Sequence, residues 1–449
     1  MLELLQPFER FFHSLMGYSA LNKLFFHIFR AVHLYLYEYA DYLVFGMLAV
    51  LPYYLIPKSW RPNYLLLASV TMIGAMFGAD FAFYLVAVPL LVHGVLERFV
   101  PRAQRDPVFR VRAISGLVVA VLVLYGLLLM RETFEWSFRI PWIDRDLDVP
   151  LLHWCGIAFM LPKLIHFIVD RLTGKIGAAR RRDFLLFLLF FPILRLGPIE
   201  RFQNFERDLK KCTVERVGRF DIVYGLYRIA LGAAKTALYA AYLYPWRMEA
   251  TPLINDIGWL RMYAMICCGM IEVYFHFGGY SDIAIGFSRL FGFKAMENFY
   301  LPFFSRNIGE WWRRWHISLS FWLRDYVYRP LGGNKRHALV NALITFTLCG
   351  AWHYLSWNYV VWGLLQGVGL AGLAAWQRFW RQVANNQNQR GFLHSLYAYF
   401  HARPRLSYGL GVVTTLHYFW LSGAFFILEM DEALLLLARL ASFGFYHAP

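Results

Sequence analysis

Apolar stretches of the length that crosses a lipid bilayer follow one another along most of this 449-residue chain. A transmembrane helix needs about 20 consecutive, mostly apolar residues. Hydrophobic residues make up 59% of the chain and charged residues only 16%, whereas a soluble domain carries about 25% charged residues. We therefore expect an all-α, polytopic membrane protein with about 10–12 transmembrane helices. The stretches that predict spans are 41–57, 63–78, 80–96, 111–130, 149–169, 221–245, 257–277, 338–353, 356–376 and 406–428.

Three regions depart from this pattern of simple spans. The apolar run 184–199 is short and ends in Arg195-Leu-Gly-Pro-Ile-Glu-Arg201. Such residues are tolerated at membrane depth where the backbone is broken and buried in protein, so we expect a re-entrant or broken helix there. The run 432–446 is a further short apolar piece. Residues 2–37 mix apolar side chains with charged ones, which predicts an interfacial opening helix.

Loop charges predict which side of the membrane each loop faces, because cytoplasmic loops carry an excess of lysine and arginine. Two segments have no such excess and should lie outside: 131–148, which is rich in acidic residues, and the nearly neutral 246–256. The basic segments, which should face the cytoplasm, are 97–112, 171–182, 201–219 and 289–337. These assignments alternate along the chain without contradiction.

The net charge of +16 raises the question of a nucleic-acid partner. Basic cytoplasmic loops explain the surplus, so we expect no nucleic acid. The five cysteines lack paired spacing, which indicates neither a disulfide framework nor a zinc site, and we expect no metal. The start of the chain has no short signal peptide with a small-residue cleavage site.

A segment rich in arginine and tryptophan, 306–336, holds the first of two candidate histidines. Asn307 and Glu310 have the spacing of a helix-capping box. A continuous helix after this box is amphipathic and suits the cytoplasmic interface, with His316 and the arginines opposite a face of Trp311, Trp315, Leu319 and Trp322. Simple anchoring in the headgroup layer is the alternative for each arginine and tryptophan. For His316 we favour a role in function or in a structural network.

The second candidate, His353, closes an uncharged apolar helix that begins near Ala338. At 1.5 Å per residue it lies about 22 Å from the cytoplasmic start, deep in the bilayer. Gly350 and Ala351 are small enough to allow close approach of another helix or a ligand. A lone buried histidine is more often a satisfied core residue than a catalyst, but the neighbouring motifs favour chemistry here.

Several motifs occur in order between residues 190 and 353. They are Phe190-Phe-Pro192 with Gly197-Pro-Ile199, Gly278-Gly-Tyr-Ser-Asp282, Glu297-Asn-Phe299, Trp312-Arg-Arg-Trp-His316, Pro330-Leu-Gly-Gly-Asn334 and Gly350-Ala-Trp-His353. Across roughly 150–370, their order and spacing resemble the membrane-bound O-acyltransferase family. The resemblance is greatest to the bacterial branch with the alginate O-acetylation membrane protein and the teichoic acid D-alanyl transferase.

The resemblance implies transmembrane, re-entrant and interfacial helices around a central funnel. His353 matches the catalytic histidine of the family and His316 the second motif histidine. The residues implied to frame the channel floor and bind substrate are Trp352, Arg313, Arg314, Asp325, Tyr280, Ser281, Asp282 and Asn298. One departure is Tyr354, where the family commonly has glycine, and it bears on the acceptor side of the pore.

The resemblance also implies an activity. An acyl group, with acetyl favoured, would pass from a cytoplasmic thioester to a hydroxyl of an extracytoplasmic polysaccharide or secreted partner. The donor would be acetyl-CoA, another acyl-CoA or an acyl-carrier protein, and no cofactor would stay bound. The chain would lie in the bacterial cytoplasmic (inner) membrane and work with a secreted or periplasmic transferase. The implied division is 1–149 as N-terminal helices, 150–376 as catalytic core and 377–449 as C-terminal helices.

Other interpretations stay open at this point. D-alanyl transfer to a teichoic acid is the nearest, and acetylation is favoured because the turn 330–334 looks more like the alginate type. A transporter should show inverted repeats, and the sequence shows none. A haem or metal redox protein using His276, His316 and His353 lacks the expected ligand spacing, and a non-enzymatic scaffold ranks below these.

Overall fold

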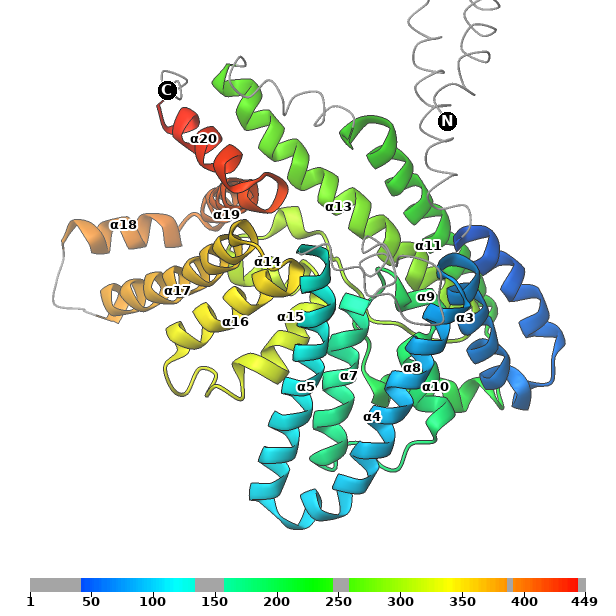
Figure 1. Ribbon diagram of the computed structural model, residues 1–449. Coiled ribbons are helices and arrows are strands. Elements are labelled where there is room, and N and C mark those ends of the chain that lie inside the picture. The colour runs from blue at the N-terminus through cyan, green and yellow to red at the C-terminus, as the bar shows by residue number, and fades with distance from the viewer. Residues whose placement is uncertain (1–41, 134–156, 245–257, 386–390, 443–449) are drawn as a thin grey trace, which may run out of the picture.

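The computed structural model describes residues 42–133, 157–244, 258–385 and 391–442 (Figure 1). Within these ranges every regular element is a helix and no strand occurs. The predicted all-α fold is confirmed. The prediction of an interfacial helix over 2–37 concerns residues outside the described ranges, as does the outer loop predicted at 246–256. Of the outer loop predicted at 131–148, only 131–133 is described, as the end of α5.

The first described helices form an up-and-down group in which α4, α5 and α7 lie side by side (Figure 1). Gly78, with φ of 99°, makes the sharp link between α3 and α4. Asp106 ends α4 and starts α5, since its Oδ1 accepts hydrogen bonds from the amides of Val108 (2.9 Å) and Phe109 (3.0 Å). The elements are a helix over Tyr42–Leu55, η1 (Lys58–Trp60), α3 (Arg61–Phe77), α4 (Ala79–Arg105), α5 (Pro107–Thr133) and α7 (Ile157–Leu172).

The predicted broken helix in 184–199 is confirmed. Helix α8 (Arg181–Leu189) stops at Phe190, and a single turn, α9 (Phe191–Leu194), follows before α10 (Phe202–Cys212). Lys163, fully buried in α7, donates from Nζ to the last carbonyls of α8, at Phe187 (3.4 Å) and Leu188 (3.1 Å). The end of α8 leaves carbonyl groups without helical partners. The break is stable because the buried ammonium group of Lys163 donates hydrogen bonds to these carbonyls.

Helices α11 (Arg219–Leu238) and α13 (Trp259–Leu290) pack closely, with a π-helical turn, η2 (Tyr239–Leu243), extending α11. A Cβ added at Gly232 would lie 2.4 Å from the carbonyl oxygen of Gly279, so the two backbones touch. The sequence predicted that this span ends at 277, before the paired glycines, and that prediction is wrong. The helix continues to Leu290 because the glycines serve helix packing and are not a terminus.

The remaining helices wrap the other side of the molecule (Figure 1). Pro330 and the following glycines break the chain as predicted, with φ of 113° at Gly332 and 54° at Gly333. The elements are η4 (Pro302–Phe304), α14 (Ile308–Arg314), α15 (Ile317–Leu323), the π-helical η5 (Arg324–Tyr328), α16 (Ala338–His353), α17 (Trp357–Asn385), α18 (Phe392–His401), α19 (Pro404–Ile427) and α20 (Met430–Ala441).

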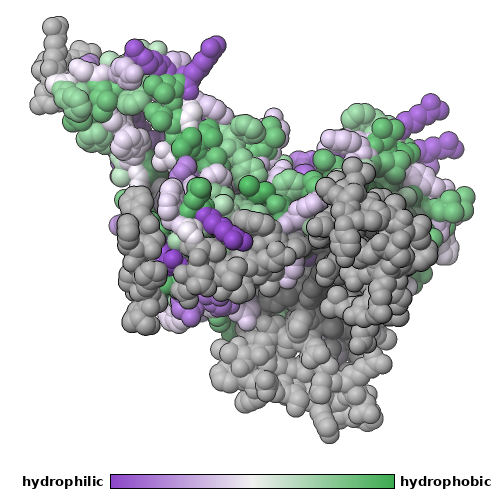
Figure 2. Space-filling view, turned by 90° about the horizontal axis from the view of Figure 1, so that it is seen from above, coloured by the Kyte–Doolittle hydropathy of each residue, from purple (hydrophilic) through white to green (hydrophobic). Residues whose placement is uncertain are grey.

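Three of the described helices are long and apolar enough to cross a membrane: Ala82–Arg105, Trp357–Asn385 and Pro404–Ile427. Tyr42–Leu55 and Ala338–His353 are shorter apolar helices. Large apolar side chains are widely exposed, and the described part of the surface in Figure 2 is mostly apolar or intermediate. Exposure on this scale suits contact with lipid. A total of about 10–12 spans stays a prediction.

Candidate functional site

The segment around His316 does not form the continuous helix that the sequence predicted. The capping box holds in part, because Asn307 Oδ1 accepts from the amide of Glu310 (2.8 Å) while Glu310 Oε2 accepts from the amide of Arg306 (3.1 Å). Helix α14 then ends at Arg314. His316 has left-handed φ and ψ of 41° and 54°, and α15 begins after it. The prediction of one amphipathic helix across this segment is therefore wrong.

A buried polar network holds the chain at this break. The carbonyl of Asn298 accepts from the amide of Ile317 (2.9 Å), and its Oδ1 accepts from the hydroxyl of Ser318 (2.6 Å). Its Nδ2 donates to the hydroxyl of Ser281 (3.0 Å), while the amide of Ile199 donates to Ser318 Oγ (2.9 Å). Asn298 is fully buried. Four segments distant in sequence thus meet at this asparagine, two of whose groups fix the residues directly after His316.

The imidazole of His316 is 2% exposed and lies among aromatic rings. Its ring centroid is 4.6 Å from that of Phe277 and 6.2 Å from that of Phe159. Its Nε2 has no hydrogen-bond partner among the described residues. A buried polar atom without a partner costs on the order of 1–3 kcal/mol, so this atom points to a ligand or water.

His353 is brought close to His316 through Trp352. The ring of Trp352 lies 6.4 Å from that of His316 and 4.8 Å from that of His353, between centroids. Its Nε1 donates to the carbonyl of Ala158 in α7 (3.2 Å), which fixes the indole. His353 is partly exposed and also faces the rings of Trp362 (5.4 Å) and Phe426 (5.3 Å). The structure therefore brings the two candidate histidines and Trp352 into one aromatic cluster.

Gly350, one of the two small residues noted in the sequence before His353, allows α16 to pack closely against α17. A Cβ added at Gly350 would lie 2.1 Å from the carbonyl oxygen of Tyr359 and 3.2 Å from the Cα of Gly363. Helices α16 and α17 therefore touch backbone to backbone one turn before His353. This contact sets the position of the last turn of α16.

The two predicted substrate-binding arginines differ in their surroundings. Arg313 is exposed. Arg314 donates to Glu310 Oε1 (2.7 Å) and lies over the ring of Tyr300, 5.7 Å from its centroid. Burial would raise the pKa of Glu310, but hydrogen bonds from the amide of Arg306 and from Arg314 hold that pKa below its usual value. Arg314 therefore stabilises the end of α14, whichever ligand binds nearby.

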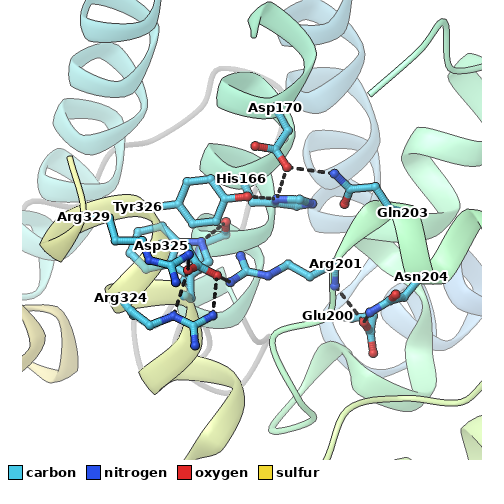
Figure 3. Close-up of polar contacts among 12 residues, drawn as sticks. His166, Asp170, Glu200, Arg201, Gln203, Asn204, Arg324, Asp325, Tyr326 and Arg329 are labelled. Atoms are coloured by element: carbon cyan, nitrogen blue, oxygen red, sulfur yellow. Dashed lines mark hydrogen bonds and ion pairs between the residues drawn. The ribbon is translucent and has the colours of Figure 1, made fainter. Parts of the chain in front are cut away.

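Asp325 lies in a separate polar cluster on η5, drawn in Figure 3. Its carboxylate contacts the guanidinium groups of Arg324 (2.9 Å), Arg329 (2.9 Å) and Arg201 (3.4 Å). The cluster borders a cavity of about 550 Å³ lined by Asp170, Lys175, Arg201, Gln203, Asp325, Tyr326, Arg329 and Pro330. Asp325 is thus part of a mixed-charge pocket and is not at the histidine pair.

His166 is a residue of this cluster that sequence reasoning did not assign. Its Nε2 accepts from the backbone amide of Phe202 (2.9 Å), so in the neutral ring Nδ1 carries the proton. Nδ1 lies 2.6 Å from the hydroxyl of Tyr326 and 3.4 Å from Asp170 Oδ2 (Figure 3). The one signal in the sequence was the i, i+4 spacing of His166 and Asp170 on a helix.

The predicted residues of α13 have structural partners. Asp282 accepts from Arg228 Nε (2.8 Å) and from Lys235 Nζ (2.7 Å), which ties α13 to α11. Tyr280 lies 5.3 Å from the ring of His276, between centroids, and Arg195 lies over its ring at 5.3 Å. Ser281 joins the Asn298 network. Of these three, Ser281 alone connects through that network to the segment that carries His316.

Among the described residues, no three or more His, Cys, Asp or Glu side chains are grouped to hold a metal ion. The histidine pair is bordered by aromatic rings, and the pocket near Asp325 by charged and amide side chains. The first arrangement suits proton transfer in a dry environment, and the second suits a charged ligand.

Comparison with known proteins gives a consistent result. Residues 181–400 match the sequence model of the membrane-bound O-acyltransferase family. The chain is 34% identical over 336 residues to a protein named probable alginate O-acetylase AlgI of Azotobacter vinelandii, covering 71% of this chain and 64% of the relative. It is 30% identical over 273 residues to the teichoic acid D-alanyltransferase of Bacillus subtilis (58% and 69%). A peptidoglycan O-acetyltransferase of Helicobacter pylori is 27% identical over 351 residues (71% and 64%). The chain spans a little under two thirds of the alginate relative.

Proposed function

Because this chain belongs to the membrane-bound O-acyltransferase family, as its motifs predicted, we propose that it transfers an acyl group to a hydroxyl. The group is acetyl, the donor is a cytoplasmic thioester, and the acceptor is an extracytoplasmic polysaccharide or secreted partner. Two of the three relatives described above are named for O-acetylation, which supports acetyl transfer. The D-alanyltransferase relative supports the second candidate, transfer of D-alanine to a teichoic acid-type polymer.

The observation that carries the proposal is that His316 and His353 both contact the ring of Trp352. The two histidines come from segments 37 positions apart and meet through ring contacts of 6.4 and 4.8 Å. One is buried with an unpartnered Nε2, and the other is partly exposed at the end of an uncharged helix. This is the environment that a neutral imidazole needs in order to accept a proton.

The proposed reaction moves one proton in two steps, first onto His353 and then onto the leaving thiolate. His353 takes the proton of the acceptor hydroxyl while its oxygen attacks the thioester carbonyl carbon. The carbon–sulfur bond then breaks, and the leaving thiolate recovers the proton from the imidazolium. His316, whose Nε2 has no hydrogen-bond partner among the described residues, orients the donor thioester. A general base of this kind contributes about 10²–10⁴-fold to the rate.

The pocket beside Asp325 is the proposed site for the anionic end of the donor (Figure 3). Its three cations, Lys175, Arg201 and Arg329, outnumber the two carboxylates of Asp170 and Asp325. Helix α7 reaches from His316, beside Phe159, to Asp170 in the pocket, a rise of about 16 Å. The long arm of coenzyme A or of an acyl-carrier protein suits this separation. Exposed Arg313 would add to the attraction for phosphate.

Localisation and partners follow from the same proposal. The apolar surface and the family indicate a membrane protein, and we propose the bacterial cytoplasmic membrane. An acceptor outside the cell requires a hydroxyl delivered from that side. We therefore propose that the chain works with a secreted or periplasmic transferase that passes the acyl group to the polysaccharide.

The test is replacement of His353 by alanine in the full chain. Incorporation of labelled acetyl from its thioester into acceptor, in membranes with matched protein levels, should fall at least about 100-fold. His401→Ala is the matched control, because His401 is exposed at the end of α18, and its activity should stay near wild type. His316→Ala should raise the donor concentration for half-maximal rate more than it lowers the maximal rate. Near-normal incorporation by His353→Ala, with the protein folded, would refute the mechanism.

A further inference from the structure

A second cavity, of about 560 Å³, lies between the end of α4 and the chain that leads into α8. Its lining residues are His93, Gly94, Glu97, Arg98, Ala179, Arg180 and Arg181. None of them lines the pocket beside Asp325, and none belongs to the histidine pair. The cavity is therefore separate from the proposed catalytic machinery.

The wall of this cavity carries an excess of positive charge. Arg98, Arg180 and Arg181 are exposed, and none forms an ion pair within the described part of the chain. The one carboxylate, Glu97, is already neutralised by Arg171, which donates from Nε (2.8 Å) and Nη2 (2.7 Å). Three guanidinium groups are thus free to bind an anion, and such groups match phosphate geometry well.

The N-terminus of α8 opens at the same place. Arg180 is its N-cap residue, and no side chain caps the first turn from that position. The first amides of a helix lack intrahelical partners and carry a partial positive charge, so they favour an anion. Helix α8 has 9 residues, enough for this dipole to form.

His93 supplies an independent sign that the cavity holds a ligand. Its side chain is 4% exposed, and neither ring nitrogen meets full hydrogen-bond geometry with a described residue, although the backbone of Ala179 lies close to the ring. Glu97 Oε1 is 4.0 Å from Nε2, too far for a hydrogen bond. The ring lies 5.0 Å from that of Phe184 in α8, between centroids. A buried donor left without a partner is costly, and an oxygen atom of a ligand would relieve that cost.

We propose that this cavity binds the phosphate of an anionic phospholipid of the cytoplasmic leaflet. The lining arginines belong to 97–112 and 171–182, both predicted to face the cytoplasm. An exposed apolar side chain of the same helix, Leu91 of α4, offers a contact to an acyl chain. Basic pockets between helices at this membrane surface bind anionic headgroups. The bound phosphate would join α4 to the start of the broken helix.

The test compares lipids on the purified full chain in detergent. Phosphatidylglycerol at about 100 times its dissociation constant should raise the melting temperature by about 5 °C, and phosphatidylcholine should not. Arg98→Gln/Arg180→Gln/Arg181→Gln should lose this shift and the lipid retained in native mass spectrometry. The matched control, Arg105→Gln/Arg110→Gln/Arg112→Gln, removes three charges from the adjoining ends of α4 and α5, outside the cavity, and should keep the shift.

Two further measurements, on single variants and with inorganic phosphate, distinguish loss of folding and binding of a soluble anion from lipid binding. If the triple variant does not fold, Arg98→Gln and His93→Phe are measured singly, and each should weaken phosphatidylglycerol binding about 10-fold while phosphatidylcholine stays without effect. Inorganic phosphate at matched ionic strength should give no shift. An equal shift with inorganic phosphate would assign the site to a soluble anion and overturn the lipid proposal. Full stabilisation of the cavity variants by phosphatidylglycerol would overturn the site itself.

Discussion

At the scale of single residues, the backbone of His316 is the feature that needs explanation. A left-handed conformation at a residue other than glycine costs on the order of 1–3 kcal/mol and persists only where its surroundings hold it. Here the φ of 41° is held by Asn298, which accepts from the Ile317 amide and the Ser318 hydroxyl directly after it. Asn298 is therefore a positioning residue for His316.

Asn298→Ala should separate this role from simple stability. Loss of the side-chain hydrogen bonds to Ser281 and Ser318 should lower the free energy of unfolding by about 1–3 kcal/mol. The donor concentration for half-maximal rate should also rise, about 10-fold or more per folded molecule, since His316, which orients the donor, loses its support. Asn341→Ala is the control, because Asn341 is also buried and donates to two carbonyls, of Gly333 (3.0 Å) and Arg336 (2.6 Å), at the far end of α16.

The comparison is made by thermal unfolding and by transfer assays on equal amounts of folded protein. The control should lose stability to a similar extent and keep its specific activity. If both variants lose activity only in proportion to their folded fraction, Asn298 has a structural role alone.

At this scale, sequence motifs contain the two histidines and Trp352, but no sequence pattern assigned His166, which lies in the separate cluster near Asp325. His316, Trp352 and His353 stand in recognisable motifs, and the structure brings them together. The partners of His166 are Phe202 and Tyr326, 36 and 160 positions away. No local pattern marks such contacts, because only the packing of α7 against η5 creates them.

At the scale of helices, the position of His353 depends on how α16 meets α17. The two backbones touch at Gly350 and Gly363, where any added Cβ would lie within about 3 Å of the backbone of the other helix. A contact this close fixes both the distance between the helices and their rotation. It therefore also fixes the position of the last turn of α16, which carries Trp352 and His353.

Gly350→Ala should move that last turn. The new Cβ would lie 2.1 Å from the carbonyl oxygen of Tyr359, so the helices must separate. Overpacking of this kind costs about 1–3 kcal/mol of stability, and a shift near 1 Å at a catalytic group costs about 100-fold in rate. Gly372→Ala in α17 is the control, since no atom lies within 4 Å of its Cβ position, and it should be neutral or slightly stabilising. Normal activity of Gly350→Ala at normal stability would contradict this account.

The sequence predicted helix breaks correctly where the residues at the break disfavour a helix. It failed where contacts with residues distant in sequence determine whether the helix breaks or continues. The break within 184–199 was predictable from Gly197 and Pro198 with the arginines beside them, which disfavour a continuous membrane helix. The break at His316 was not, because the local sequence favours a continuous amphipathic helix and the opposing hydrogen bonds come from Asn298. The continuation of α13 through Gly278 and Gly279 was missed because the contact of Gly279 with α11 is not visible in the local sequence.

At the scale of the whole molecule, the two cavities bring the basic loops to one side. The cavity near the start of α8 is lined both by Arg98, from the basic segment 97–112, and by Arg180, from the basic segment 171–182. The pocket beside Asp325 is lined by Lys175, Arg201 and Arg329, which come from the basic segments 171–182, 201–219 and 289–337. In Figure 1 the α4–α5 link and the end of α7 both lie at the lower edge of the molecule. All four segments predicted to face the cytoplasm therefore contribute to one face, which supports the orientation derived from loop charge.

This orientation can be tested with single cysteines in a variant that lacks the native ones. Gly177→Cys is suitable for the inner face, because Gly177 is exposed and has no atom within 4 Å of its Cβ position. Ile140→Cys and Pro252→Cys lie in the segments predicted to face out. In intact cells an impermeant thiol reagent should label 140 and 252 and leave 177 unlabelled, while after lysis 177 should react as fast as a denatured standard. Labelling of 177 in intact cells would reverse the orientation. It would also place the cavity at Arg98 and the pocket at Arg201 on the outer face, away from both the cytoplasmic donor and the cytoplasmic leaflet.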